Sequence, residues 1–256
     1  MVEPEVTPPE PRPVPWYVWV VGGLALLVLA VVLLTPSIDG HHGRESARRS
    51  ICTNNLKLFG IALQTYHDQH KCFPPAFFAD EHGTPIHSWR VLLLPYLEEP
   101  ELTALYEQYR FDEPWNGPRN RELLDKAPAV FRCPSDEDNM SETNYLAVVG
   151  PQTVWPGTGN TKIRQITDGT SLTIAVVECS DSGINWLEPR DVTFDDASLG
   201  INKLQSRPAI RSQHRGRGAN FLFADGSVHF LNDDTPANVL HALLTSAGGE
   251  EIEIPQ

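Results

Sequence analysis

Two stretches decide how this chain folds: WYVWVVGGLALLVLAVVLL (residues 16–34) and ESARRSICTNNLKLFGIALQTY (residues 45–66). The first contains 19 residues without a charged side chain, and as a helix it would extend about 28 Å, close to the hydrocarbon thickness of a bilayer. Aromatic residues cluster at its start, as they do at membrane interfaces. We therefore expect an uncleaved transmembrane helix at residues 16–34. The alternative is a cleaved signal peptide, which would have a shorter apolar region and a basic start.

The second stretch predicts an amphipathic helix. Five apolar residues recur at spacings of four, three, four and three, which places them on one face of a helix: Cys52, Leu56, Phe59, Leu63 and Tyr66. Pro36 and Gly40 are expected to separate this helix from the preceding one. Because a single apolar face needs a surface to cover it, the downstream chain has to supply that surface.

The predicted organisation has five parts. They are a disordered proline-rich tail (1–15), the transmembrane helix (16–34), a linker (35–43), a head (44–249) and an acidic tail (250–256). The sequence after residue 250 is short and acidic, and we expect it to be exposed.

Within the head, the pattern predicts short helices first, then antiparallel strands and a closing helix. Pro95 and Pro100 divide the segment from Ser88 to Tyr109 into short helices. NYLAVVG (144–150) and SLTIAVVEC (171–179) are rich in β-branched residues, as strands are. Asp225-Gly226 lies between two alternating apolar runs, which predicts a β-hairpin with a type I′ turn. The fold class we expect is α+β.

Composition limits the possible functions. The formal net charge is −13, which argues against a general nucleic-acid-binding protein. The four cysteines, Cys52, Cys72, Cys133 and Cys179, contain no C-x-x-C pair, so a zinc site is only weakly indicated. An even number of cysteines after a membrane helix favours two disulfides in an oxidising compartment, and their spacing leaves three connectivities open.

Charge and cysteines disagree about the orientation of the head. Arg44, Arg48 and Arg49 follow the apolar segment, and by the positive-inside rule they would place the head in the cytoplasm. The cysteines favour the opposite side.

Several motifs in one order resemble a known bacterial family: SARRSICTNNLKLFGIALQTY, SWRVLLLPYLEE, FRCPSDE, TNYLAVVG, ITDGTS and ANFLFADGSVHFL. The chain is similar over about residues 44–249 to the planctomycete-expanded prepilin-like family of unknown function. That family ends with a signature of a histidine, nine residues and Asp-Gly, which here corresponds to His214, Asp225 and Gly226.

The resemblance implies a type II secretion pseudopilin-like build, with a long helix packed on a small antiparallel sheet. It also implies an extracytoplasmic (periplasmic) head on the cell inner membrane. Family members carry cysteines at two of these motifs, which implies a Cys52–Cys133 disulfide and leaves Cys72 with Cys179. Possible partners are the lipid bilayer, through residues 16–34, and other pseudopilin-like or envelope proteins.

Two features depart from the family pattern. The apolar segment lacks the G-F-T-L-x-E-like start and basic leader that a prepilin peptidase recognises, which favours a fixed single-pass anchor. Ten residues instead of nine separate His214 from Asp225.

The sequence predicts no catalysis. His214, Asp225 and a nearby serine suggest a hydrolase, but no G-x-S-x-G motif is present and Asp225 is needed for the turn. No cofactor is expected; a calcium site at Asp225, Asp233 and Asp234 is a weaker alternative to solvated acidic loops.

The predicted function is a membrane-anchored, pseudopilin-like structural or interaction protein of the cell envelope. The alternative is a membrane-tethered module that binds a carbohydrate or another solute, for which Trp155 and Trp186 would be the stacking residues.

Overall fold

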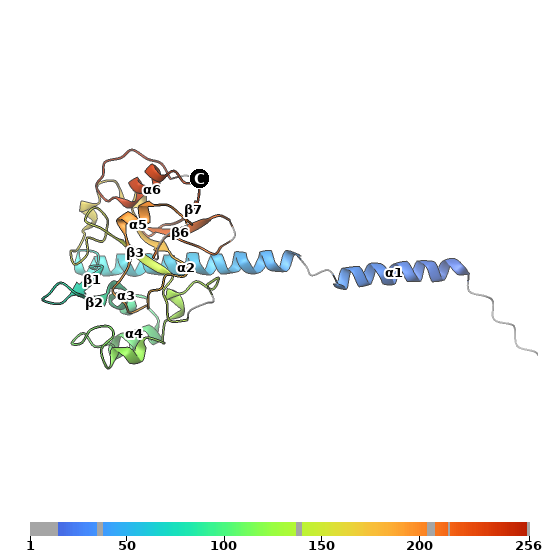
Figure 1. Ribbon diagram of the computed structural model, residues 1–256, viewed down its shortest axis with the longest axis horizontal. Helices are drawn as coiled ribbons and strands as arrows, with labels where there is room; N and C mark the ends of the chain where they lie inside the picture. The colour runs from blue at the N-terminus through green and yellow to red at the C-terminus, as the bar shows by residue number, and fades with distance from the viewer. Residues whose placement is uncertain (1–14, 35–37, 137–139, 204–207, 215, 255–256) are drawn as a thin grey trace, which may run out of the picture. The chain divides into compact units, whose positions relative to one another are not determined.

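The computed structural model describes residues 15–34, 38–136, 140–203, 208–214 and 216–254. The chain divides into two compact units, residues 1–43 and 44–256. The first contains helix α1 (Trp16–Leu34) and the start of α2 (Ile38–His70), and the second contains all other elements (Figure 1). The predicted disordered tail falls almost wholly outside the described residues.

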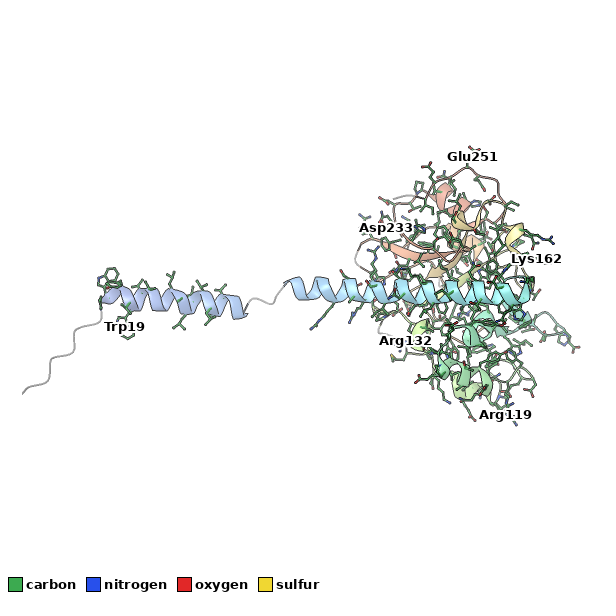
Figure 2. All side chains as sticks on the ribbon, turned by 180° about the vertical axis from the view of Figure 1, so that it is seen from behind. Trp19, Arg119, Arg132, Lys162, Asp233 and Glu251 are labelled. Atoms are coloured by element: carbon green, nitrogen blue, oxygen red, sulfur yellow. The ribbon has the colours of Figure 1, made fainter. Side chains whose placement is uncertain are left out.

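Helix α1 forms where the apolar run predicts a helix, and its described side chains, Trp19 among them, point outward and are exposed (Figure 2). In the described part of the chain, however, no helix is both long enough and apolar enough to cross a membrane. The predicted transmembrane helix at 16–34 is therefore wrong, as is the single-pass inner-membrane location. A spanning helix needs about 20 apolar residues, and the prediction accepted a stretch near the lower limit of that length. The bilayer contact inferred from it loses its support.

Helix α2 confirms the predicted amphipathic pattern. Cys52, Leu56 and Phe59 are fully buried, Leu63 is nearly so, and Tyr66 is partly buried at the edge of the same face. The helix begins earlier than predicted, at Ile38, so it includes residues 38–43 of the predicted linker, and Gly40 does not interrupt it.

The second unit has an α+β fold around a five-stranded sheet with the order β5-β3-β4-β6-β7. Its strands are β3 (Tyr145–Val149), β4 (Ile174–Glu178), β5 (Val192–Thr193), β6 (Gly218–Phe223) and β7 (Val228–Asn232). The predicted strands at 144–150 and 171–179 are confirmed. All neighbouring pairs are antiparallel except β3 and the edge strand β5, which are parallel. A separate two-stranded hairpin pairs β1 (Phe77–Ala79) with β2 (Pro85–Ser88).

Short helices fill the connections. They are α3 (Trp89–Leu93), η1 (Leu94–Tyr96), α4 (Pro100–Gln108), η2 (Asn120–Leu123), η3 (Ala129–Phe131), η4 (Ile163–Gln165), η5 (Thr170–Leu172), α5 (Phe194–Ser198) and α6 (Ala237–Leu244). Ser88 caps α3 through its side chain, and α4 begins at Pro100, as the sequence predicts.

The sheet separates two hydrophobic cores because successive side chains of a strand point to opposite faces. On β3, Tyr145 and Ala147 pack with the buried face of α2, whereas Leu146 and Val148 pack with α5 and α6 on the other side. The result is three layers, with α2 on one face of the sheet and α5 and α6 on the other (Figure 1).

The β6–β7 hairpin is confirmed, but its turn differs from the predicted type. Gly226 has φ +90°, whereas neither Ala224 nor Asp225 has a positive φ. The Gly226 N–H donates to the Phe223 carbonyl at 2.9 Å, so the turn is centred on Ala224 and Asp225. A type I′ turn requires positive φ at both central residues, and the arrangement found instead is a turn followed by a glycine bulge.

The turn docks directly on α2. A β-carbon added at Gly60 would lie 3.0 Å from the α-carbon of Gly226 and 3.0 Å from Leu222 Cδ1. Gln64 Nε2, one helical turn later, donates to the Ala224 carbonyl at 2.6 Å. The absence of a β-carbon at Gly60 therefore allows the helix and the hairpin turn to approach each other closely.

A buried ion pair fixes the edge of the sheet. Arg90 lies 2.5 Å from Asp191, and both side chains are almost completely inaccessible. Asp191 also accepts from the backbone N–H of Ala147 at 2.8 Å and from the indole of Trp89. Burial raises the pKa of Asp191 to about 6 even though Arg90 counteracts it. The pair thus joins α3, β3 and the segment before β5.

We expect Gly60→Ala to destabilise the fold by about 1–3 kcal/mol, because the methyl group overpacks a contact made by backbone. Gly43→Ala is the matched control in the same helix, since nothing lies within 4 Å of its added β-carbon; it should be neutral or stabilising by up to about 1 kcal/mol. Urea denaturation measures both. Equal effects of the two substitutions would contradict the close approach.

We expect Asp191→Asn to cost about 3–5 kcal/mol, because it leaves the buried Arg90 guanidinium without its counter-charge. The control is Arg217→Gln, which removes an ion pair with Asp233 whose arginine side chain is 85% exposed; we expect less than about 1 kcal/mol. Guanidinium denaturation followed by circular dichroism distinguishes the two results. A loss under 1 kcal/mol for Asp191→Asn would show that the pair contributes no more than a surface contact.

Candidate metal centre

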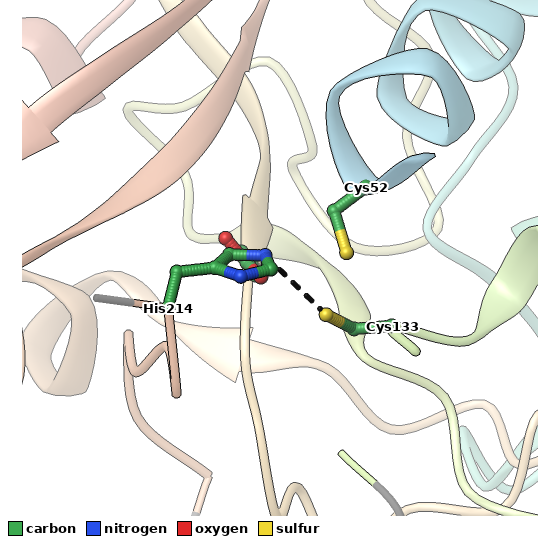
Figure 3. A group of neighbouring side chains, drawn as sticks. Cys52, Cys133 and His214 are labelled. Carbon is green, nitrogen blue, oxygen red and sulfur yellow. Dashed lines mark hydrogen bonds and ion pairs between the residues drawn. The ribbon is translucent and has the colours of Figure 1, made fainter. Parts of the chain in front are cut away.

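Four side chains that are far apart in the sequence meet between α2 and the sheet. Cys52 comes from α2, Cys133 from the segment after η3, Glu178 from the end of β4 and His214 from the segment before β6. Their sulfur, oxygen and nitrogen atoms all lie within 4.8 Å of one another, and all four residues are buried. Figure 3 shows the Cys133 sulfur directed toward the imidazole and the Cys52 sulfur directed toward that of Cys133. We call this group the thiol–imidazole cluster.

The imidazole of His214 lies between two carboxylates. Its Nε2 is 3.0 Å from Glu178 Oε1 and 3.4 Å from Cys133 Sγ, and its Nδ1 is 2.7 Å from Glu45 Oε1. Ser135 Oγ lies 3.2 Å from the same Nδ1. Both ring nitrogens therefore have partners, and the ring orientation is fixed.

Hydrogen bonds hold the other members in place. Glu178 Oε2 accepts from both the backbone N–H and the side-chain amide of Asn220, at 3.0 and 2.8 Å. The backbone N–H of Cys133 donates to Asn144 Oδ1 at 2.7 Å, and the amide of Asn144 donates to Asp136 and to the Cys179 carbonyl. The cluster is thus supported by β3, β4 and β6 together.

The surroundings shift the protonation of the cluster strongly. Burial lowers the pKa of His214, but its hydrogen bonds with Cys133 and Glu178 and the charge of Glu178 outweigh this effect and raise the pKa to about 11. A hydrogen bond with Cys52 and burial both raise the pKa of the Cys133 thiol. At neutral pH, His214 is therefore an imidazolium and Cys133 a neutral thiol.

All four cysteines are free in the structure, so neither predicted disulfide is formed. Cys52 and Cys133 nevertheless lie close together in the cluster, as the implied pairing requires. Cys72 is partly exposed, and its sulfur accepts from Asn160 at 3.2 Å. Cys179 is buried in the core on the α6 side of the sheet, where burial raises the pKa of its thiol to about 12.

The signature residues separate in the structure. His214 belongs to the cluster, while Asp225 and Gly226 form the hairpin turn that contacts α2. Asp225 Oδ1 accepts from the Ser227 N–H at 2.8 Å, which is a turn role.

The three carboxylates considered for calcium do not converge. Asp225 is at the turn of the hairpin, whereas Asp233 and Asp234 follow the far end of β7. Asp233 pairs with Arg217. Among the described residues, the group that could hold a metal ion is the thiol–imidazole cluster, which includes none of these aspartates.

Cys133, His214 and Glu45 have the order of a thiol–imidazole–carboxylate triad, but two features oppose catalysis. The His214 side chain is fully buried. The thiol also has a raised pKa, whereas a nucleophilic cysteine needs a lowered one.

Sequence reasoning missed Glu178 and Glu45. Glu178 is the one charged residue in the apolar run SLTIAVVEC, and a charge in a buried strand is a signal that it has a partner. Glu45 gives no comparable signal, because it begins a polar stretch of helix.

The arrangement defines an α+β protein in which a long helix and a sheet enclose a buried group of two thiols, an imidazole and a carboxylate. Residues 41–199, more than half of the chain, match the family described as "Protein of unknown function (DUF1559)", and the chain belongs to this family. No curated protein and no solved structure shows significant similarity to the chain.

We expect one thiol of the native protein to react fast. After unfolding in the presence of a chelator and without a reductant, we expect four thiols to react. Cys72 is the partly exposed thiol, and the other three are buried. Reaction with Ellman's reagent measures the number, and Cys72→Ser should remove the fast phase. Only two thiols after unfolding would show that a disulfide forms in solution.

Proposed function

We propose that this protein is a non-catalytic structural or interaction protein of pseudopilin-like build. It associates with other copies of itself, or with other pseudopilin-like or envelope proteins, through the exposed side of α2. The observation that carries this proposal is the three-layer unit in which a long amphipathic helix covers a mainly antiparallel sheet. That is the build implied by the prepilin-like motifs.

The outer side of α2 offers a contact surface. Ile51 and Ile61 are 47% and 58% exposed, and Leu58 between them is partly exposed while also packing against the core. Spacings of seven and three residues put the three side chains along one strip of the helix. Exposed polar residues, Asn54 and Lys57 among them, lie on the same side of the helix.

The solute-binding alternative finds less support. Trp155 and Trp186 are both fully buried, and each indole N–H donates to a backbone carbonyl, of Ala175 and Leu123 respectively. Neither ring offers a face on which a sugar could stack. A hydrolase is disfavoured by the burial of the thiol–imidazole cluster.

A photoreactive phenylalanine analogue at Ile61 of the full chain should give covalent dimers on irradiation. The matched control is the same analogue at Leu199, which directly follows α5 and is 54% exposed. This variant should give few covalent dimers. Denaturing electrophoresis and mass spectrometry of the cross-linked peptides measure both. Ile61→Asp should shift the sedimentation coefficient toward that of a monomer.

Monomers alone at both positions, at protein concentrations up to the millimolar range, would overturn self-association through α2. Equal cross-linking from Ile61 and Leu199 would do so too, because it would reflect random collision.

A further inference from the structure

We propose that Cys52, Cys133, Glu178 and His214 bind one Zn²⁺ ion in a closed, structural site. The ion would join α2 to the sheet. This inference does not rest on self-association, because the cluster lies inside the second unit and away from the exposed side of α2.

The spacing of the donor atoms fits a tetrahedral ion. Bonds of about 2.0–2.3 Å from zinc to nitrogen, oxygen and sulfur place neighbouring ligand atoms about 3.3–3.8 Å apart. The His214 Nε2 to Cys133 Sγ distance is 3.4 Å, and the Nε2 to Glu178 Oε1 distance is 3.0 Å. All four donor atoms lie within 4.8 Å of one another, so shifts of a few tenths of an ångström up to about 1 Å bring them to these separations.

The chemistry of the donors selects the metal. Two thiols, an imidazole and a carboxylate suit a borderline-soft ion such as Zn²⁺ and do not suit calcium or magnesium, which prefer oxygen ligands. The thiols and the imidazolium lose protons when the ion binds, as is general for such sites.

One oxygen of the cluster has a single close polar partner. Glu178 Oε1 is fully buried and forms an ion pair with His214 Nε2 at 3.0 Å, and no further hydrogen bond reaches it from the described residues. A buried carboxylate oxygen with one partner has unused acceptor capacity. Glu178 Oε1 lies close to Nε2 and to the two thiols, as expected for a metal ligand.

The residues around the cluster match those that usually surround zinc ligands. A ligating histidine commonly donates its other ring N–H to a carboxylate, and Nδ1 of His214 lies 2.7 Å from Glu45. The second oxygen of Glu178 is held by two donors from Asn220. Glu45 is therefore a positioning residue that touches no ion itself.

The site has no position left for a substrate. Four protein ligands complete a tetrahedral ion, and Cys52 and the His214 side chain are fully buried. The ligands come from α2, the η3 segment, β4 and the β6 approach, so binding would stabilise contacts that are distant in sequence. A disulfide between Cys52 and Cys133 would remove two ligands, so the zinc-bound form and the disulfide form exclude each other.

The test uses the full chain purified with a reductant, stripped with a chelator and titrated with Zn²⁺ or Co²⁺. We expect one ion per chain by elemental analysis, and a raised melting temperature on adding Zn²⁺. With Co²⁺ we expect the visible bands of a tetrahedral ion and a sulfur-to-cobalt charge-transfer band. Absence of that band, or stoichiometry near zero in the folded protein, would overturn the proposal.

Variants separate the site from adventitious binding. Cys133→Ser and Glu178→Gln should lose the tetrahedral spectrum, and Cys72→Ser, outside the cluster, should keep it. Glu45→Gln retains all four ligands, so it remains informative if the others fail to fold; we expect its Co²⁺ affinity to fall about 10–100-fold. Unchanged affinity in Glu45→Gln and Glu178→Gln, or loss of binding in Cys72→Ser, would contradict the assignment.

Discussion

The packing of α2 against the centre of the sheet is the constraint on which the second unit depends. Leu56 and Phe59 bury their side chains there, and Phe59 contacts the rings of Trp89, Phe131 and Tyr145. Each large apolar side chain removed from water contributes about 1.5–3 kcal/mol, so this face outweighs any single polar contact in the fold. Short helices and loops fill the remaining space. They have little regular structure of their own, and their positions depend on the packing of α2 on the sheet.

This packing also requires α2 and the β6–β7 hairpin turn to lie close together. The hairpin turn reaches α2 because Gly60 lacks a β-carbon, and Gly226 supplies the positive φ of +90° that the turn needs. The Asp-Gly of the signature is thus explained by backbone geometry and by helix contact, without any chemical role. His214, the other half of the signature, serves a different part of the same interface. The two halves of the motif therefore secure α2 at separate places along its length.

The sequence predicted helices and strands well, but it did not predict the turn geometry and the long-range contacts around them. The face of α2 and strands β3 and β4 followed from local periodicity, which survives in any context. The turn type failed because Asp-Gly fits more than one register, and the β1–β2 hairpin was hidden by Pro74 and Pro75. The membrane interpretation of residues 16–34 failed because apolar character alone does not establish a spanning length. The resemblance implied that Cys52 and Cys133 lie together and singled out His214, but the approach of Glu178 to them depends on strand pairing, which local sequence does not show.

Burying such a cluster is expensive unless something compensates for it. An imidazolium, a carboxylate and two thiols in the core lose hydration, and the pair of Glu178 and Glu45 around His214 recovers part of that cost. Apolar residues of the same volume would give a simpler and equally compact core. The polar cluster also favours one arrangement of distant segments, with or without an ion, because α2, β4 and the β6 approach must be in register for all its members to be satisfied at once. A shift of α2 by one residue would rotate Cys52 by about 100° and separate it from the other three.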